Sequence, residues 1–487
     1  MKKAQKVIAD ILFSLTAILL VTVFILSVSS GLKFPLLAII IGVLALYLFR
    51  YKHCALRLAK RLLSNKAVLV VVIIISLLAR LAPLILNFEY QCKNDLSDTG
   101  VHYFGAQELV NGGGLDAKIA NYEKTFPYLY PYTLFLSASN RILGNINTSV
   151  VLSNIILDSI SCFFIYLLLN KLHPSSKRMG ILLWSINPFS IVMCWLPMNI
   201  ILVNCIITAA LLVGVFILNN DKLFWSALFG VIIFIGNLFR PIFTILLIAL
   251  IIAMLCHNVS SVKKKVACTL LVLLFAFVPN AILTNAIKEK YDDNILGSSG
   301  GWSFFVGSNY STSGQWSRED SDYYFGIIAP KYEKISDAQE EIKHEGIERY
   351  RQMGPLKIID HMANKLSVLF SKISTSIYDI KYTFGIEEDT LLYKILTSLV
   401  GVFFSTLAFL AIQYMRNAIK ANHLSLYLYL SILGFTAAFL IVEVMNRYSS
   451  VYFALLIPLA SIAFTNLLHD KQKKGDKQKK KATASKR

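Results

Sequence analysis

The chain has 487 residues, of which 56% are hydrophobic and 16% are charged, and its formal net charge is +19. Soluble proteins carry about a quarter charged residues, so this composition excludes a soluble multidomain protein. Apolar runs of about twenty residues, the length of a bilayer-crossing helix, indicate an all-α polytopic membrane protein. The positive charge lies beside these runs and in the C-terminal tail, which favours a topology signal over nucleic-acid binding.

The apolar runs divide the chain into five regions. The first region is a pair of N-terminal transmembrane helices followed by a basic cytoplasmic loop. The last region is a basic tail that is predicted to be disordered. Between them lie a transmembrane core, a polar region with interfacial helices (a helix pair within 331–370), and the C-terminal transmembrane helices. In chain order the regions are 1–66, 67–286 with a first polar loop at 88–126, 287–390, 391–469 and 470–487.

The placement of Lys and Arg predicts the orientation of the chain. Both termini are expected in the cytoplasm and the polar loops 88–126 and 287–390 on the extracellular face of a cell membrane. We expect about twelve crossings. Parity requires one segment between 127 and 170 only to dip into the membrane, and the Pro-containing Phe126–Arg141 is the best candidate. The apolar segments are 7–29, 34–50, 67–87, 127–144, 148–170, 179–197, 199–219, 223–239, 241–257, 266–286, 391–415, 423–443 and 447–468.

The first polar loop contains Asp95, Asp98, His102 and Tyr103. Asp98 begins a predicted short helix over 99–110. It is either a helix N-cap or a general base, since a partly desolvated carboxylate near the membrane gains basicity.

The second polar region contains a Gly/Ser-rich stretch with Trp302, Asn309 and Trp316. Its aromatic rings suit stacking on a sugar or covering a lipid, and equally the ordinary aromatic belt of a membrane protein.

Ionisable residues within or between apolar runs are costly in a bilayer, so they mark candidate functional positions. Arg240 breaks one run, and Glu443, Arg447 and Tyr448 separate the last two; Asp158 lies inside another. The charge rule places Arg240 and the Glu443–Tyr448 group on the same side of the membrane as Asp98. An arginine there suits a lipid phosphate or a snorkelling helix end, while Glu443 and Arg447 also suit a structural ion pair.

These motifs, in this order, resemble the polytopic GT-C glycosyltransferases, which include protein O-mannosyltransferases and the lipid A aminoarabinose transferase, and above all bacterial family-39-like members. The resemblance covers about residues 67–465. It is carried by Ser97-Asp98 with Tyr103, Phe126-Pro127, Leu143-Gly144, Asn237-x-x-Arg240-Pro241, Gly301-Trp302 with Gly307-x-Asn309 and Gly314-x-Trp316, and Glu443-x-x-x-Arg447-Tyr448 with Pro458.

The resemblance implies a GT-C-like bundle and transfer of a sugar from a polyprenyl-phosphate donor to a hydroxyl of a cell-envelope glycan, lipid or protein, with inversion. Asp98 would be the base, Arg240 and Arg447 would hold the leaving phosphate, and the Trp302–Trp316 loop would close over a substrate. The substrate-binding set that we expect is Asp95, His102, Tyr103, Arg240, Trp302, Asn309, Trp316, Glu443, Arg447 and Tyr448.

Two departures from the family pattern bear on a metal. Asp98 is followed by Thr99 instead of a second acid, and Pro197-Met198-Asn199 lacks the acid of many relatives. No cofactor is therefore predicted, although a divalent metal is possible. Relatives also cross twice between 127 and 170, which would place Lys171–Arg178 outside. A transporter or flippase of a polyprenyl-linked sugar, or a surface-polysaccharide ligase or polymerase, are the alternative functions.

Overall fold

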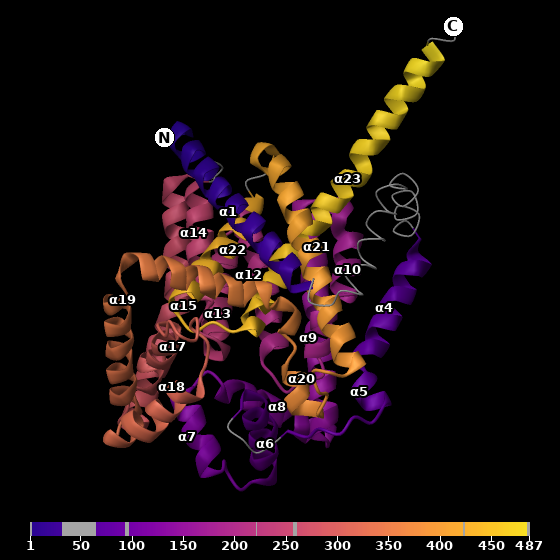
Figure 1. Ribbon diagram of the computed structural model, residues 1–487. Coiled ribbons are helices and arrows are strands. Elements are labelled where there is room, and N and C mark those ends of the chain that lie inside the picture. Colours follow the sequence, from indigo (N-terminus) through magenta and orange to yellow (C-terminus); the bar gives the residue numbers. More distant parts are fainter. Residues whose placement is uncertain are drawn as a thin grey trace.

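The computed structural model describes residues 2–31, 65–92, 97–220, 222–256, 261–421 and 424–484. Every element in these ranges is a helix, which confirms the predicted all-α fold. Figure 1 shows a bundle with both termini at one end and α6, α7, α8 and α20 at the opposite end, which we call the loop end. The predicted segment 34–50, the basic loop up to residue 64 and Asp95 lie outside the described residues.

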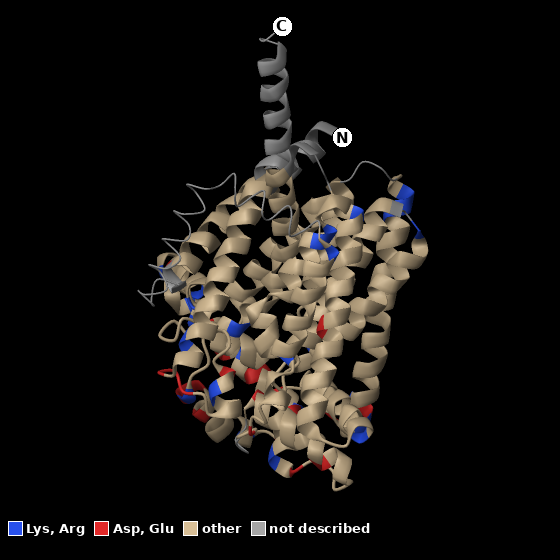
Figure 2. Ribbon diagram, turned by 90° about the vertical axis from the view of Figure 1, so that its right-hand side faces the viewer, with Lys and Arg blue, Asp and Glu red and all other residues tan. Residues whose placement is uncertain are grey.

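Six stretches of the described chain are long and apolar enough to cross a membrane, which confirms a polytopic membrane protein; the number of about twelve crossings stays a prediction. Figure 2 shows that most charged residues lie toward the two ends of the bundle, with acidic residues gathered at the loop end. The six stretches are α9 (Ile146–Leu172), Ile200–Asn219 of α12 (Ile200–Asn220), α15 (Val262–Tyr291), Leu391–Met415 of α21 (Leu391–Ala421), α22 (Leu424–Ile441) and Asn446–Leu468, made of η5 (Asn446–Ser449) and the start of α23 (Ser450–Ala484).

Shorter apolar helices complete the bundle. They are α13 (Leu223–Phe239), α14 (Thr244–Cys256) and the stretch Ser14–Val28 within α1 (Lys2–Gly31). The helix α4 (Lys66–Arg80) and the short α5 (Ala82–Ile85) precede the first polar loop.

Two predicted segments differ from a single spanning helix. Residues 179–197 form α10 (Lys177–Ser185, after η1, Pro174–Ser176) and α11 (Pro188–Met193), because Pro188 disfavours a helical Asn187. Residues 127–144 form α8 (Tyr130–Leu143), whose 14 residues extend about 21 Å, less than a bilayer core. Figure 1 places α8 at the loop end, in agreement with a segment that does not cross.

The tail that was predicted to be disordered instead continues α23 as a helix through Ala484. Its Lys, Gln and Ala residues are good helix formers, and the helix is already nucleated inside the bundle.

The loop end is built from short helices and one bent long helix. α19 (Ile335–Ser371) bends at Gly354, whose φ of 71° is left-handed, and Pro355, so the predicted helix pair within 331–370 is confirmed. The remaining helices of this end are α6 (Asp98–Asn111), α7 (Ala117–Thr125), α16 (Ile295–Ser298), α17 (Gly301–Gly307), α18 (Arg318–Tyr323), η2 (Tyr324–Ile328), η3 (Ala329–Lys331), η4 (Ile373–Thr375) and α20 (Asp379–Phe384).

Asp158, which the sequence places inside an apolar run, forms a buried ion pair. Arg80 of α4 meets its Oδ2 at 2.7 Å, and the indole of Trp184 donates to its Oδ1 at 3.0 Å. Through these contacts Asp158 links α9 to α4 and α10 within the core of the bundle. Loss of either partner would leave an uncompensated buried charge, so the pair has a structural role.

Candidate functional site

Asp98 is the first residue of α6 and lies in its first turn. The N-cap of α6 is Ser97, whose hydroxyl accepts a hydrogen bond from the Gly100 amide at 3.3 Å. The predicted N-cap role of Asp98 is therefore wrong. Its carboxylate, about a quarter exposed, is free for another partner.

Arg447 is that partner. Its Nη2 donates to Asp98 Oδ2 at 2.6 Å, and its Nη1 lies 3.2 and 3.4 Å from the two oxygens of Asp379. The same Nη1 donates to the hydroxyl of Tyr378 at 3.2 Å. One guanidinium on η5 thus joins a carboxylate of α6 to a carboxylate of α20.

Arg240 and Tyr448 lie next to this cluster. The guanidinium carbon of Arg240 is 4.2 Å from the ring centre of Tyr448, a cation–π contact. The Tyr448 hydroxyl donates to Glu443 Oε2 at 3.1 Å. We call Asp98, Asp379, Glu443, Arg447, Arg240 and Tyr448 the Arg447 site.

The motif Asn237-x-x-Arg240-Pro241 has a local structural reason. The Asn237 carboxamide accepts a hydrogen bond from the Phe243 amide at 3.0 Å and lies 3.3 Å from the Thr244 hydroxyl. It therefore closes the turn between α13 and α14. Arg240, the C-cap residue of α13, donates its backbone amide to Gly236 O at 2.9 Å, and its guanidinium forms no hydrogen bond or ion pair with the described residues.

Burial dominates the electrostatics of the site. It raises the pKa of the Glu443 carboxyl, with Arg447 and the Tyr448 hydrogen bond opposing the rise. It also raises the pKa of Asp379, again opposed by Arg447. Tyr122 and Tyr128 stay neutral because burial raises the pKa of both phenols, and the Tyr122 hydroxyl lies 3.4 Å from Asp98 Oδ1.

The turn that carries Glu443 is fixed by backbone pairing with the second polar region. The Glu443 amide donates to Ser303 O at 2.6 Å, and the Val444 amide donates to Gly314 O at 2.9 Å. A side chain at Gly307 would place Cβ 2.3 Å from the Val442 carbonyl carbon. The fully buried ammonium of Lys365 donates to the carbonyls of Gly307 and Val442, at 2.9 and 2.6 Å.

The structure brings together five of the residues singled out in the sequence: Asp98, Arg240, Glu443, Arg447 and Tyr448. His102 lies one turn behind Asp98 and is bonded to Thr133, at 2.9 Å from Nδ1. Burial lowers its pKa to about 4, so it is neutral at neutral pH. Tyr103 donates to Asn147 and stacks on Tyr90.

The Gly/Ser-rich stretch does not form an open aromatic loop. Trp302 is 4% exposed and packs against Phe126 and Tyr324. The Asn309 amide donates to Asp320, so it is part of the local fold, whereas Trp316 is 52% exposed. Within the described ranges, no hydrogen bond, ion pair or ring contact joins these three residues to the Arg447 site.

Sequence reasoning missed Asp379, Tyr378, Tyr122 and Tyr128. Tyr122 and Tyr128 flank Phe126-Pro127, one of the motifs that carry the family resemblance, so their position in the sequence could have marked them as candidate site residues. Asp379 sits in a polar stretch of ordinary composition, and only its contact with Arg447 distinguishes it.

No group of three or more His, Cys, Asp and Glu side chains suited to a metal ion is present in the described part of the chain. Asp98 and Asp379 share a guanidinium, which supplies a positive charge between them. Three of their four carboxylate oxygens lie within 3.4 Å of this guanidinium, so the described donor set does not fit a divalent ion.

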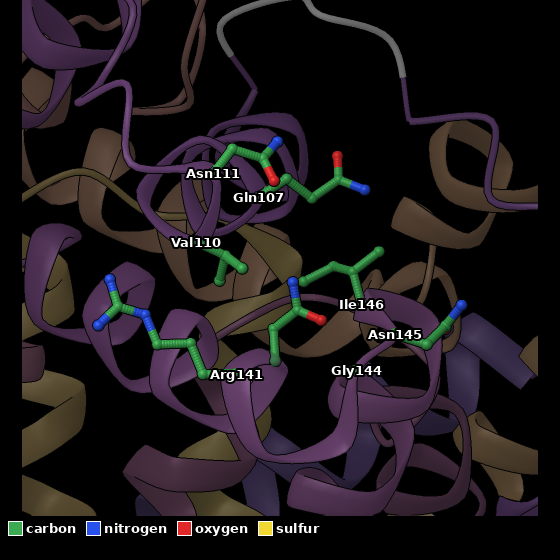
Figure 3. Close-up of a pocket in the computed structure, with 8 residues that line it drawn as sticks. Gln107, Val110, Asn111, Arg141, Gly144, Asn145 and Ile146 are labelled. Atoms are coloured by element: carbon green, nitrogen blue, oxygen red, sulfur yellow. The ribbon is translucent and has the colours of Figure 1, made fainter.

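A separate cavity lies at the far end of α6. It has a volume of about 590 Å³. Figure 3 shows Gln107, Val110 and Asn111 facing Arg141, Asn145 and Ile146 across it. Gln107 is about 14 Å along the helix from Asp98, so this cavity is distinct from the Arg447 site.

Comparison with known proteins agrees with the sequence resemblance. Residues 127–283 match the model of a family described as dolichyl-phosphate-mannose-protein mannosyltransferase, which confirms the predicted likeness to GT-C membrane glycosyltransferases. The matched stretch includes Arg240 and excludes Asp98, Glu443 and Arg447. The chain matches no curated protein.

Among solved structures, the chain is similar to the oligosaccharyltransferase of Archaeoglobus fulgidus, determined in complex with Zn and sulfate. The identity is 14% and the TM-score 0.46, over 82% of this chain and 49% of that one. The chain therefore spans about half the length of that relative.

Proposed function

We propose that this protein is a membrane glycosyltransferase that moves a sugar from a polyprenyl-phosphate donor to a hydroxyl of a cell-envelope acceptor, on the extracellular face. The observation that carries the proposal is the Arg447 site, in which Arg447 holds the partly exposed carboxylate of Asp98 and the neighbouring Tyr448 carries Arg240, whose guanidinium forms no ion pair with the described residues. The match of residues 127–283 to a lipid-linked-sugar-dependent family supports the donor class.

Asp98 is the proposed base. The acceptor hydroxyl oxygen attacks the anomeric carbon, its proton passes to the Asp98 carboxylate, and the bond between anomeric carbon and phosphate oxygen breaks. The polyprenyl phosphate leaves with the bonding electron pair, and in-line attack inverts the anomeric centre. Arg447 holds Asp98 Oδ2, which leaves Oδ1 for the incoming hydroxyl.

The two arginines have different proposed roles. Arg447 already donates to two carboxylates and a phenol, so it orients the base. Arg240 has its guanidinium edge free while its face rests on Tyr448. A guanidinium binds phosphate oxygens bidentately, so Arg240 holds the leaving phosphate. Tyr122, Tyr128 and Tyr448 provide neutral hydroxyls and ring faces for the sugar.

The test is sugar transfer in membranes that contain the wild type or Asp98→Asn, with a panel of radiolabelled polyprenyl-phosphate sugars and endogenous acceptors. Loss of a general base reduces transfer by at least about a hundredfold, at an equal protein level. Asp389→Asn is the matched control, because Asp389 is exposed and forms no hydrogen bond or ion pair with the residues of the Arg447 site.

Transfer by Asp98→Asn at the wild-type rate would move the base to Asp95 or Glu443. Absence of transfer by the wild type with every donor would contradict the proposed enzyme and favour a transporter of a polyprenyl-linked sugar.

A further inference from the structure

The segment from Ile373 to Gly385, made of η4 and α20, contacts the turn that carries Arg447. The Asn446 carboxamide donates to Thr375 O at 2.8 Å and to its hydroxyl at 3.1 Å. One residue later, Arg447 bonds Tyr378 and Asp379. The segment thus fixes both the backbone next to Arg447 and the guanidinium itself.

The same segment also contacts the chain that leads to Asp98. The Gln91 amide donates to Thr383 O at 2.7 Å, and the Tyr90 ring lies 4.8 Å from Phe384. A side chain at Gly385, whose φ is 66°, would place Cβ 2.5 Å from the Gln91 carboxamide oxygen. Six residues after Gln91, Ser97 caps the helix that carries Asp98. Ile373–Gly385 is therefore a bridge between the two halves of the Arg447 site.

Within this bridge, Asp379 is the charged contact. It is 5% exposed, so it is shielded from any substrate, and the guanidinium of Arg447 is its ion-pair partner. A buried carboxylate next to a second carboxylate is unfavourable without a shared cation. Here Asp98 and Asp379 bind the two terminal nitrogens of the Arg447 guanidinium. One positive charge is therefore shared by two negative charges, and neither carboxylate is fully neutralised.

We propose that Asp379 is a positioning residue that fixes Arg447 and, by competing for its guanidinium, keeps Asp98 able to accept the acceptor's proton. This inference rests on the proposed function, in which Asp98 is the base. If Asp379 were neutral, Arg447 would neutralise Asp98 alone, and a carboxylate paired with a full positive charge takes up a proton only at lower pH.

The measurement is the pH dependence of sugar transfer. Replacing Asp379 by Asn removes the competing charge while keeping nearly the same shape. We expect the acid limb of the rate profile to move down by about one pH unit and the maximal rate to fall at least about tenfold. The ionisable groups that face Asp98 and are unchanged in this variant are His102, Tyr122, Tyr128, Tyr378, Glu443 and Arg447.

Two further variants separate positioning from mere stabilisation. Asp379→Glu keeps the charge and displaces it by one methylene, so it should lower the maximal rate and leave the acid limb in place. Asp389→Asn removes an exposed charge ten residues away and should change neither. A purely structural role would lower the amount of active enzyme in Asp379→Asn without moving the limb, and that result would overturn the inference.

The outcome also separates this inference from the proposed function. Wild-type transfer that is lost in Asp98→Asn, together with an unmoved limb in Asp379→Asn, contradicts the role of Asp379 alone. If the Asp379→Asn protein does not accumulate, the Asp379→Glu variant decides instead. A maximal rate equal to that of the wild type in Asp379→Glu would also contradict the positioning role of Asp379. An inactive wild type contradicts the enzyme itself.

Discussion

Arg447 and Asp98 are 349 positions apart in the chain, yet a guanidinium nitrogen of one lies 2.6 Å from a carboxylate oxygen of the other. The contact joins the first turn of α6 to η5, between the last two apolar helices. The side chain of Arg447 is 12% exposed and that of Asp98 26%. Asp98 is therefore the more exposed member of the ion pair, and in the proposed reaction the acceptor hydroxyl approaches on its side.

Arg447→Lys tests whether the contacts with Asp98 and Asp379 require the planar guanidinium group of arginine. An ammonium keeps the charge but cannot bond Asp98 and Asp379 from opposite nitrogens in one plane. We expect transfer to fall at least about a hundredfold while the protein still accumulates. The control is Arg351→Lys, because Arg351 is 73% exposed and pairs with Glu348 on the surface. Wild-type transfer by Arg447→Lys would show that charge alone suffices.

The sequence was sufficient for the class of fold, because bilayer-length apolar runs allow few alternatives to helices. It also assigned Asp98, Arg240 and the Glu443–Tyr448 group to one side, since the charge rule orients every polar loop at once. It failed where pairing in space decides the role. Trp302 looked like a substrate-stacking ring because glycines surround it, but those glycines allow close packing against Gln339 and Val442.

Asp379 shows the complementary limit. Nothing in Tyr378-Asp379-Ile380 differs from an ordinary polar helix start, and its importance comes from an arginine 68 positions away. Local patterns cannot predict such a pair without covariation between positions. The same holds for Arg80 with Asp158: the sequence marked the acid as costly in a membrane but left its partner unassigned.

Arg240 is predicted to act on donor binding. Arg240→Ala removes the guanidinium that lies on Tyr448 and has no carboxylate of its own. We expect the KM for the polyprenyl-phosphate sugar to rise about tenfold or more, since charge-assisted bonds contribute about 1.5–3 kcal/mol, and the KM for the acceptor to stay unchanged. Initial rates at varied donor concentration measure this.

Arg318→Ala is the matched control for Arg240, because Arg318 is 88% exposed and its ion pair with Asp322 lies at the surface. An equal rise in the KM for both substrates in Arg240→Ala would contradict a specific role at the phosphate.

Trp302 and Trp316 should differ in their effect on stability. Trp302→Ala empties a site that is 4% exposed and lined by Phe126, Phe305 and Tyr324, which costs about 3–5 kcal/mol. Trp316→Ala truncates a ring that is 52% exposed and should change stability by less than about 0.5 kcal/mol. Thermal unfolding of the detergent-solubilised variants compares them. Equal midpoints would argue against the buried cluster.

The last prediction concerns Glu123, which is 4% exposed and accepts a hydrogen bond from the Thr133 hydroxyl at 2.5 Å. Burial raises the pKa of its carboxyl from 4.5 to about 7, and the bond from Thr133 offsets only part of that rise. In the part of the chain that the structure describes, its second carboxylate oxygen has no hydrogen-bond partner. The folded chain therefore binds this proton more tightly than the unfolded chain does.

The sign of the pH effect follows from this difference. Below about pH 4.5 the carboxyl is protonated in both states, and as the pH rises toward 7 unfolding releases the proton, so the fold loses stability. A shift of this size corresponds to about 3 kcal/mol. Glu123→Gln cannot ionise, so its unfolding midpoint should fall less than that of the wild type between pH 5 and 8. Parallel curves for the two proteins over this range would show that Glu123 is already ionised in the folded chain at pH 5.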